Sequence, residues 1–230
     1  MTARVDQDAP RLPLSRERVL DAAVAFADEA GVEAVSMRRL GERLGVEAMS
    51  LYNHVKNKDD LLDGMIDTIV AEIEVPAGEE DWKAAMRSQI LAAREVMKRH
   101  QWAPAVLETR VSMSQPMMRY MDDFCGTFIR GGFSIDLTHH ALHALGSRML
   151  GFNQELFNDS EALEESPEVQ ALMLNQMAGV YPNIHRLMVE ITHQEDTIVG
   201  SGCDDDVEFT FSLDLILDGI ERLKQAEEAS

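Results

Sequence analysis

The stretch from Met37 to Lys58, MRRLGERLGVEAMSLYNHVKNK, restricts the possible folds of this 230-residue chain more than any other feature. Apolar residues recur in it at helical spacing for about two turns, and Gly45 then stands where a chain leaving a helix needs a left-handed residue. A second short periodic segment follows, rich in side chains that donate or accept hydrogen bonds. Two short helices joined by a glycine turn, the second of them polar, are typical of a helix-turn-helix.

A polar second helix suits the major groove of DNA, which admits one α-helix and is read there by hydrogen bonds and apolar contacts to base edges. The pattern alone leaves an alternative open, because any helical hairpin in an all-α protein has a turn and some polar surface. On that alternative the chain is a helical adaptor, or a small-molecule-binding protein without DNA recognition.

The residues themselves favour DNA binding. The segments LSRERVLDAAVAFADEAGVEAVSMRRL and LGVEAMSLYNHVKNKDDLLDGM resemble the DNA-binding domain of the tetracycline-repressor (TetR) family. This resemblance implies an all-α fold, with an N-terminal three-helix helix-turn-helix domain and a C-terminal helical core that binds ligand and dimerises. The function it implies is not enzymatic: a transcriptional repressor that binds a palindromic operator as a homodimer and is released by a small-molecule inducer.

The resemblance also implies which residues contact double-stranded operator DNA. The expected set is Arg38, Arg39, Glu47, Ala48, Met49, Ser50, Tyr52, Asn53, His54 and Lys58. Within it we assign Tyr52 and Lys58 to phosphates, and Arg38 and His54 to bases. Arginines in the first turn of a helix oppose its dipole, so an outside anion or base explains Arg38 and Arg39 better than helix stability does.

One departure from the family lies at the start of the second helix. Tetracycline repressors carry Gln-Pro-Thr where this chain has Ala48, Met49 and Ser50. A glutamine that could make a bidentate contact with adenine is therefore absent, and we expect a different operator sequence.

Helical periodicity and breaker residues divide the chain into three parts. Residues 1–13 are expected to be a flexible arm, 14–75 the DNA-binding domain with its motif at 36–55, and 81–228 the ligand-binding and dimerisation domain. Helices are expected at about 15–31, 36–45, 46–55, 57–73, 81–100, 104–109, 115–130, 134–157, 166–191 and 204–226. No segment has the alternation of a strand.

The net charge of −20 argues against DNA binding at first sight. However, residues 1–60 hold nine Lys and Arg against eleven Asp and Glu, so the acidic excess lies mainly in the rest of the chain. The chain opens with neither a charged-then-apolar leader nor a long apolar run, and Cys125 and Cys203 lack metal-site spacing. We therefore expect a cytoplasmic protein without membrane contact.

Two segments point to a dimer. RGGFSIDLTHHALHALGSRMLGFNQE and the C-terminal FTFSLDLILDGIERL resemble the helices that form a four-helix dimer interface in tetracycline repressors. The final helix also has more apolar surface than a terminal surface helix needs, so burial against a second copy is expected. The alternative is that both helices pack within one subunit.

Fourteen methionines suit a pocket for a variable apolar ligand, although core filling explains most methionines. The candidate ligand-binding residues are His100, Trp102, Met117, Met121, Phe124, His143, Phe152 and Glu155. By resemblance, His100 and Glu155 match residues that hold a drug-bound magnesium in tetracycline repressors. However, no hydroxyl closely follows His100 in QWAPAVLETR, and magnesium prefers six oxygen ligands. We therefore predict no cofactor and no metal in the free protein, and an apolar or aromatic inducer other than a tetracycline–magnesium chelate.

An enzyme is the competing class. The sequence has no nucleophile elbow, P-loop or dinucleotide fingerprint. His139 and His143 stand four residues apart and could be two metal ligands or two acid-base groups. A histidine pair on one helix without nearby acid is more often structural, so we do not expect catalysis.

Overall fold

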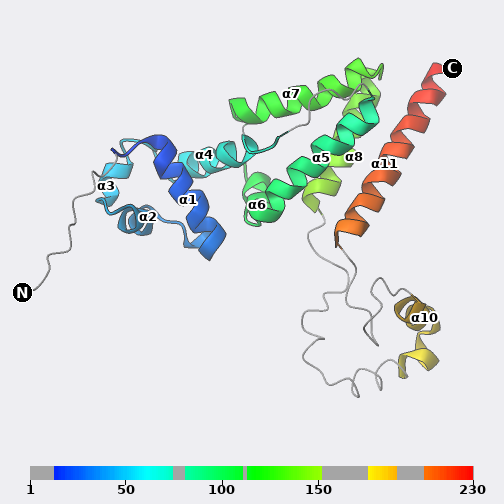
Figure 1. Ribbon diagram of the computed structural model, residues 1–230, viewed down its shortest axis with the longest axis horizontal. Coiled ribbons are helices and arrows are strands. Elements are labelled where there is room, and N and C mark those ends of the chain that lie inside the picture. Colours follow the sequence, from blue (N-terminus) through cyan, green and yellow to red (C-terminus); the bar gives the residue numbers. More distant parts are fainter. Residues whose placement is uncertain (1–12, 75–80, 111–112, 152–175, 191–204, 230) are drawn as a thin grey trace, which may run out of the picture. The chain divides into compact units, whose positions relative to one another are not determined.

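The computed structural model describes residues 13–74, 81–110, 113–151, 176–190 and 205–229, and all regular structure in these ranges is helical (Figure 1). The all-α fold class is therefore confirmed. The chain divides into two compact units, Met1–Gly132 and Phe133–Ser230. Within the described ranges, no helix combines the length and the apolar character that crossing a membrane requires.

The first unit contains seven α-helices in its described residues. They are α1 (Arg16–Ala30), α2 (Met37–Leu44), α3 (Ala48–Leu51), α4 (Lys58–Val70), α5 (Trp82–Arg99), α6 (Ala103–Glu108) and α7 (Gln115–Arg130), with a short 3-10 turn, η1 (Val32–Ala34), between α1 and α2. Three N-cap residues begin their helices, because each side chain accepts a hydrogen bond from a backbone N–H in the first turn. These residues are Ser15, Ser36 and Asn57.

One hydrophobic core connects the N-terminal helices with α5 and α6. Its fully buried members include Val19 of α1, Leu40 of α2, Leu51 of α3, Met65 of α4 and Ala103 of α6. Burying a large apolar side chain contributes about 1.5–3 kcal/mol, so this shared core fixes α1 to α4 against α5 and α6. The helix-turn-helix thus packs against the helices that follow residues 75–80. The domain boundaries 14–75 and 81–228 stay a prediction.

The second unit contains α8 (Ile135–Gly151), α10 (Pro182–Glu190) and α11 (Asp205–Glu228). Helices α8 and α11 run antiparallel, since Ser134 before α8 donates a hydrogen bond to Glu227 near the end of α11 at 3.1 Å. At the other end, Arg148 of α8 donates to Ser212 of α11 at 2.6 Å. Buried apolar side chains fill the contact between them: Leu137, Ala141, Leu145, Phe209, Leu213, Leu217 and Ile220. The predicted extension of α8 to residue 157 and the predicted helix start at residue 166 lie outside the described residues.

Candidate nucleic-acid interface

Two glycines shape the turn between α2 and α3. Gly45 ends α2 with φ 68° and ψ 34°, the left-handed conformation that its position predicts. Gly41 has a different role, because a Cβ atom there would lie 2.9 Å from the Val46 carbonyl oxygen and 3.2 Å from the Ala48 Cα. Sequence reasoning missed Gly41, although a glycine inside a helix, at a cost of about 1 kcal/mol, is a signal of close packing. The two glycines together let α3 cross close to α2.

Arg16 and Asp60 hold the far end of α3 in place. The Arg16 guanidinium lies 2.8 and 3.1 Å from the two carboxylate oxygens of Asp60, and it also donates to the His54 carbonyl at 2.8 Å. Asp60 accepts the backbone N–H of Lys56 at 2.7 Å as well. The hydrogen bond from Arg16 is the main reason why the pKa of Asp60 lies below its ordinary value. These bonds fix the turn after α3 to both α1 and α4.

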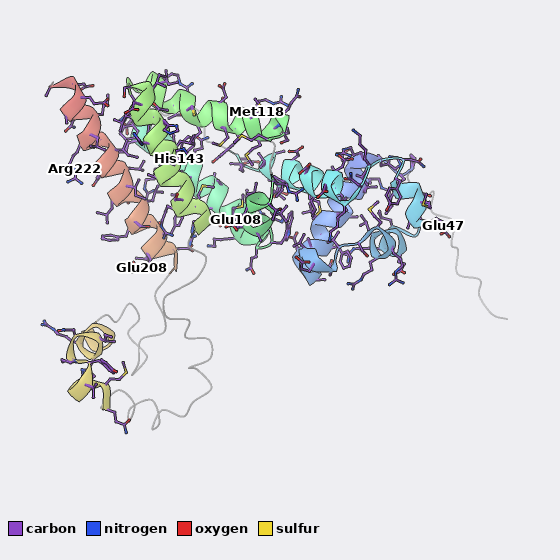
Figure 2. All side chains as sticks on the ribbon, turned by 180° about the vertical axis from the view of Figure 1, so that it is seen from behind. Glu47, Glu108, Met118, His143, Glu208 and Arg222 are labelled. Atoms are coloured by element: carbon purple, nitrogen blue, oxygen red, sulfur yellow. The ribbon has the colours of Figure 1, made fainter. Side chains whose placement is uncertain are left out.

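The α3 segment presents a mixed apolar and polar surface. Leu51 and Val55 point into the core, whereas Met49 is 74% exposed and Tyr52 is exposed beside it. Glu47, which precedes α3 and is labelled in Figure 2, is also exposed. The remaining candidates of this segment fall into two groups: Asn53 and Lys58 are exposed, and Ala48, Ser50 and His54 are half-buried.

The two arginines at the start of α2 differ in their surroundings. Arg38 is exposed and lies 3.3 Å from Glu42 one turn later, an exposed pair that contributes at most about 1 kcal/mol. Arg39 instead donates to the Ala34 carbonyl at 3.2 Å, and its guanidinium lies 5.0 Å from the centre of the Phe26 ring. Arg38 can therefore turn toward a ligand at little cost, while Arg39 would have to leave these contacts.

His100, the first of the ligand candidates, is 6% exposed at the end of α5 and lies between two carboxylates. Its Nδ1 is 2.8 Å from Asp28 of α1, and its Nε2 is 3.3 Å from Glu72 after α4. Burial opposes ionisation of Glu72, but hydrogen bonds from Arg99 and His100 outweigh burial, so the pKa of Glu72 is lowered. The indole N–H of Trp102 donates to Asp28 at 2.7 Å.

These contacts do not fit a metal ligand. Both ring nitrogens of His100 face carboxylate oxygens, so a cation at either nitrogen would have to displace one of these contacts. In the described ranges no three His, Cys, Asp or Glu side chains are grouped so that they could hold a metal ion. His100 instead connects α1 and the end of α4 to α5.

The other ligand candidates lie on two units. Met117, Met121 and Phe124 are on α7 in the first unit, where Phe124 is buried and packs 5.6 Å from Phe128. His143 is exposed on α8 in the second unit (Figure 2). Phe152 and Glu155 lie outside the described residues.

The histidine pair on α8 is not part of the hydrophobic core. His139 and His143 are both exposed, with ring centres 4.6 Å apart. The interpretation of the pair as structural rather than catalytic stays a prediction.

Comparison with known proteins agrees with the helix-turn-helix. The family model described as "Bacterial regulatory proteins, tetR family" matches residues 19–65. The model described as "Tetracyclin repressor-like, C-terminal domain" matches residues 75–223.

Individual proteins of similar sequence or structure are also transcriptional repressors or TetR-family proteins. The chain is 30% identical to the HTH-type transcriptional repressor DrrR1 of Streptomyces coeruleorubidus, over 96% of this chain and 83% of that protein. It is 31% identical to the class D tetracycline repressor of Escherichia coli, over 67% and 72%. The crystal structure of apo ActR from Streptomyces coelicolor has a TM-score of 0.70 and 26% identity, and the match covers 95% of this chain and 99% of that one. ActR has also been crystallised in complex with actinorhodin.

Proposed function

The chain belongs to the tetracycline-repressor family of bacterial transcriptional regulators, and on this premise we propose that it binds a palindromic operator as a homodimer and leaves it when a small molecule binds. Its relatives are regulators and not enzymes, and it is itself a transcriptional repressor with a ligand-binding C-terminal domain. The contacting residues, the operator symmetry, the dimer and the effector are the parts that we propose.

The observation that supports the proposed DNA contact is that the α3 segment is exposed and held in place at both ends. Met49 and Tyr52 project from a short helix whose two ends are fixed, by the close approach at Gly41 and by the Arg16–Asp60 pair. A rigid backbone that presents exposed side chains is what base readout needs, because sequence is read by a few side chains held at the groove edge. Lys58 and Tyr52 then contact phosphates, and Arg38, Met49 and His54 face bases.

The dimer is supported by the outer face of α8 and α11. Phe211, Leu215 and Leu223 of α11 are exposed, and so is Ile135 at the start of α8. Monomeric soluble proteins rarely leave such apolar rows uncovered. A second copy packed on this face gives a two-fold symmetric protein, which matches a palindromic site whose halves lie about 10 bp, or a multiple of this, apart.

Effector control needs a connection between the C-terminal helices and α3. In the first unit that connection consists of the shared core, of His100 between Asp28 and Glu72, and of Arg110, which lies 3.1 Å from Asp63 of α4. An effector that prefers a different position of α5 to α7 would move α4 and with it α3. As a repressor acts on chromosomal DNA, the proposed location is the cytoplasm.

Fluorescence anisotropy with DNA from upstream of the protein's own gene tests the proposal, together with analytical ultracentrifugation of the free protein. We expect a dimer at micromolar concentration, and binding to this DNA that is at least about a thousand times tighter than to scrambled DNA at the same salt concentration. Equal affinity for both DNAs would refute operator recognition. No DNA binding at all would favour the alternative, a small-molecule-binding protein or adaptor.

A further inference from the structure

Two histidines of α8 form an exposed pair that the proposed function does not use. His139 and His143 are four residues apart, so their side chains lie one turn apart on the same face of the helix. Both are exposed, and their ring centres are 4.6 Å apart. His143 is labelled in Figure 2. Among the described residues, neither ring takes part in a hydrogen bond or an ion pair, so both imidazoles are open to a ligand from solution.

The neighbouring His140 belongs to a different face of α8. One residue turns an α-helix by about 100°, so the side chain of His140 leaves the helix in another direction than that of His139. Its Nε2 lies 3.7 Å from a carboxylate oxygen of Asp136, one turn earlier. The ring centres of His139 and His140 are also farther apart, at 5.6 Å. His139 and His143 are thus the two imidazoles of α8 that share a face and have no carboxylate partner in the described residues.

The spacing of these two rings fits a shared metal ion. A transition metal bound at about 2.0–2.1 Å to an imidazole nitrogen lies about 3.2 Å from the centre of that ring. Two rings that share one ion at about 90–109°, the angles of octahedral and tetrahedral geometry, then have centres about 4.5–5.2 Å apart. The observed 4.6 Å lies within this range. The pair therefore needs rotation of its rings, and no movement of the helix backbone, to bind one ion.

Imidazole ligands select the kind of ion. They suit Zn²⁺, Cu²⁺ and Ni²⁺, whereas Mg²⁺ and Ca²⁺ prefer oxygen ligands. In the part of the chain that the structure describes, no third His, Cys, Asp or Glu side chain completes a metal site, so water takes the other coordination positions. Two protein ligands hold an ion weakly. Protein prepared without added metal therefore stays metal-free, as the sequence predicts, and the site fills when the ion is supplied.

We propose that His139 and His143 form a chelating site for a divalent transition-metal ion such as Ni²⁺, Cu²⁺ or Zn²⁺. The site goes beyond the proposed function, because neither operator binding nor effector release requires it. Both protein ligands come from one helix, so the site does not depend on a second copy of the chain. A bound ion joins two successive turns of α8, and so stabilises the helix that packs against α11.

Calorimetric titration of the full chain with Ni²⁺, without an added histidine tag, tests the site. The titration is done at about pH 7.5, because the imidazoles must be deprotonated to bind. We expect one ion per chain with a dissociation constant of roughly 1–200 µM, since two of the four ligands of a structural zinc site supply about half of its binding free energy. Mg²⁺ should not bind to the pair. No binding of Ni²⁺, or equal binding of Ni²⁺ and Mg²⁺, would overturn the proposal.

Single variants assign the ion to the pair. His139→Ala and His143→Ala should each weaken Ni²⁺ binding at least about tenfold, because one ligand remains. Both positions are exposed, so both variants should keep the Tm of the metal-free wild type, measured by circular dichroism. His140→Ala, at the exposed neighbouring position, is the matched control and should bind Ni²⁺ as the wild type does. Unchanged affinity in both pair variants, or an equal loss in His140→Ala, would mean adventitious binding and would refute the assignment.

A double variant tests the spacing itself. In His139→Ala combined with Ser147→His, an exposed position supplies a new histidine one turn after His143. The pair is rebuilt at the same spacing, so affinity should return to within about threefold of the wild type. Affinity that stays as low as in His139→Ala would contradict the chelate. These titrations contain no DNA, so their outcome is independent of the proposed repressor function.

Discussion

His100 Nδ1 lies 2.8 Å from Asp28 Oδ1, and the same oxygen accepts the indole N–H of Trp102 at 2.7 Å. One carboxylate of α1 thus receives two hydrogen bonds from the segment that connects α5 with α6. Asp28 and Trp102 are 74 residues apart in the sequence, so the hydrogen bond joins two distant segments of the chain. The helix that supports the DNA-binding motif is joined directly to residues on which a ligand-driven movement would act.

Trp102→Phe should test how much this contact contributes. The change replaces the buried indole by a smaller aromatic ring and removes the N–H donor, so we expect the free energy of unfolding to fall by about 1–2 kcal/mol. For a chain of this size that corresponds to a decrease in Tm of roughly 2–8 °C, measured by circular dichroism. Gln101→Ala, at the exposed neighbouring position, is the control and should stay within about 0.5 kcal/mol of the wild type. An unchanged Tm in Trp102→Phe would contradict the assignment.

The Arg16–Asp60 pair predicts a defined pH dependence. Because the folded-state pKa of Asp60 lies below its ordinary value of 3.8, the pair stabilises the protein above that value. The stabilisation is lost as the pH falls from about 4 through the folded-state pKa. We expect the Tm difference between wild type and Asp60→Asn to be largest near pH 7 and to shrink below pH 4. Both side chains are partly exposed, so solvent screening keeps the effect small.

The control for this prediction is Asp59→Asn at the neighbouring, more exposed position, where Arg110 is 3.5 Å away. Its Tm difference from wild type should vary less with pH. A constant difference between wild type and Asp60→Asn from pH 7 to pH 3 would show that the carboxylate charge of Asp60 contributes nothing.

Local sequence signals predicted most of the fold. The helix expected at 115–130 is α7, Gln115–Arg130, and the one expected at 36–45 is α2, Met37–Leu44. Helical spacing, a serine at the start and a glycine at the end are properties of a few consecutive residues, so they can be read without knowing the rest of the chain. The left-handed turn at Gly45 could be predicted from its neighbours in the sequence in the same way.

The contacts that position the candidate site could not be predicted in this way. Arg16 and Asp60 are 44 residues apart, and His100 and Asp28 are 72 apart. Each partner is one of many charged residues in the sequence, and only the packing of α1 on α4 and the position of the segment after α5 select it. The resemblance assigned His100 to a ligand from its position in the sequence, and its contacts with Asp28 and Glu72 could not be predicted from that position.

Arg38 and Lys58 should separate base contacts from phosphate contacts. Lys58→Ala should weaken binding to operator and random DNA alike, and should reduce the slope of log affinity against log salt by about one. Arg38→Ala should cost about 1–3 kcal/mol on the operator and relax the choice of base at one position. Anisotropy titrations at several salt concentrations measure both effects. Equal losses on operator and random DNA for Arg38→Ala would contradict its assignment to a base.

Met49 should contact a thymine methyl group in the major groove. Its apolar side chain is exposed at α3, and such contacts read the 5-methyl of thymine. Met49→Ala should then weaken operator binding by about 0.8 kcal/mol or more, roughly fourfold. Replacing the contacted thymine by uracil should cause a similar loss in the wild type and almost none in Met49→Ala. Additive losses from the two changes at every thymine of the operator would show that Met49 reads no methyl group.

Tetracycline with magnesium should not be an effector of this repressor. The resemblance matches His100 with the family's metal-binding histidine, but the two ring nitrogens of His100 face Asp28 and Glu72, at 2.8 and 3.3 Å. Binding a cation at either nitrogen would break these contacts, and Asp28 and Glu72 would keep only the indole N–H of Trp102 and the guanidinium of Arg99. Each lost hydrogen bond opposes binding by about 1–3 kcal/mol. Calorimetric titration with tetracycline at millimolar magnesium should therefore give no submicromolar binding. Submicromolar binding that disappears with a chelator and in His100→Ala would show that His100 leaves the carboxylates to hold the metal.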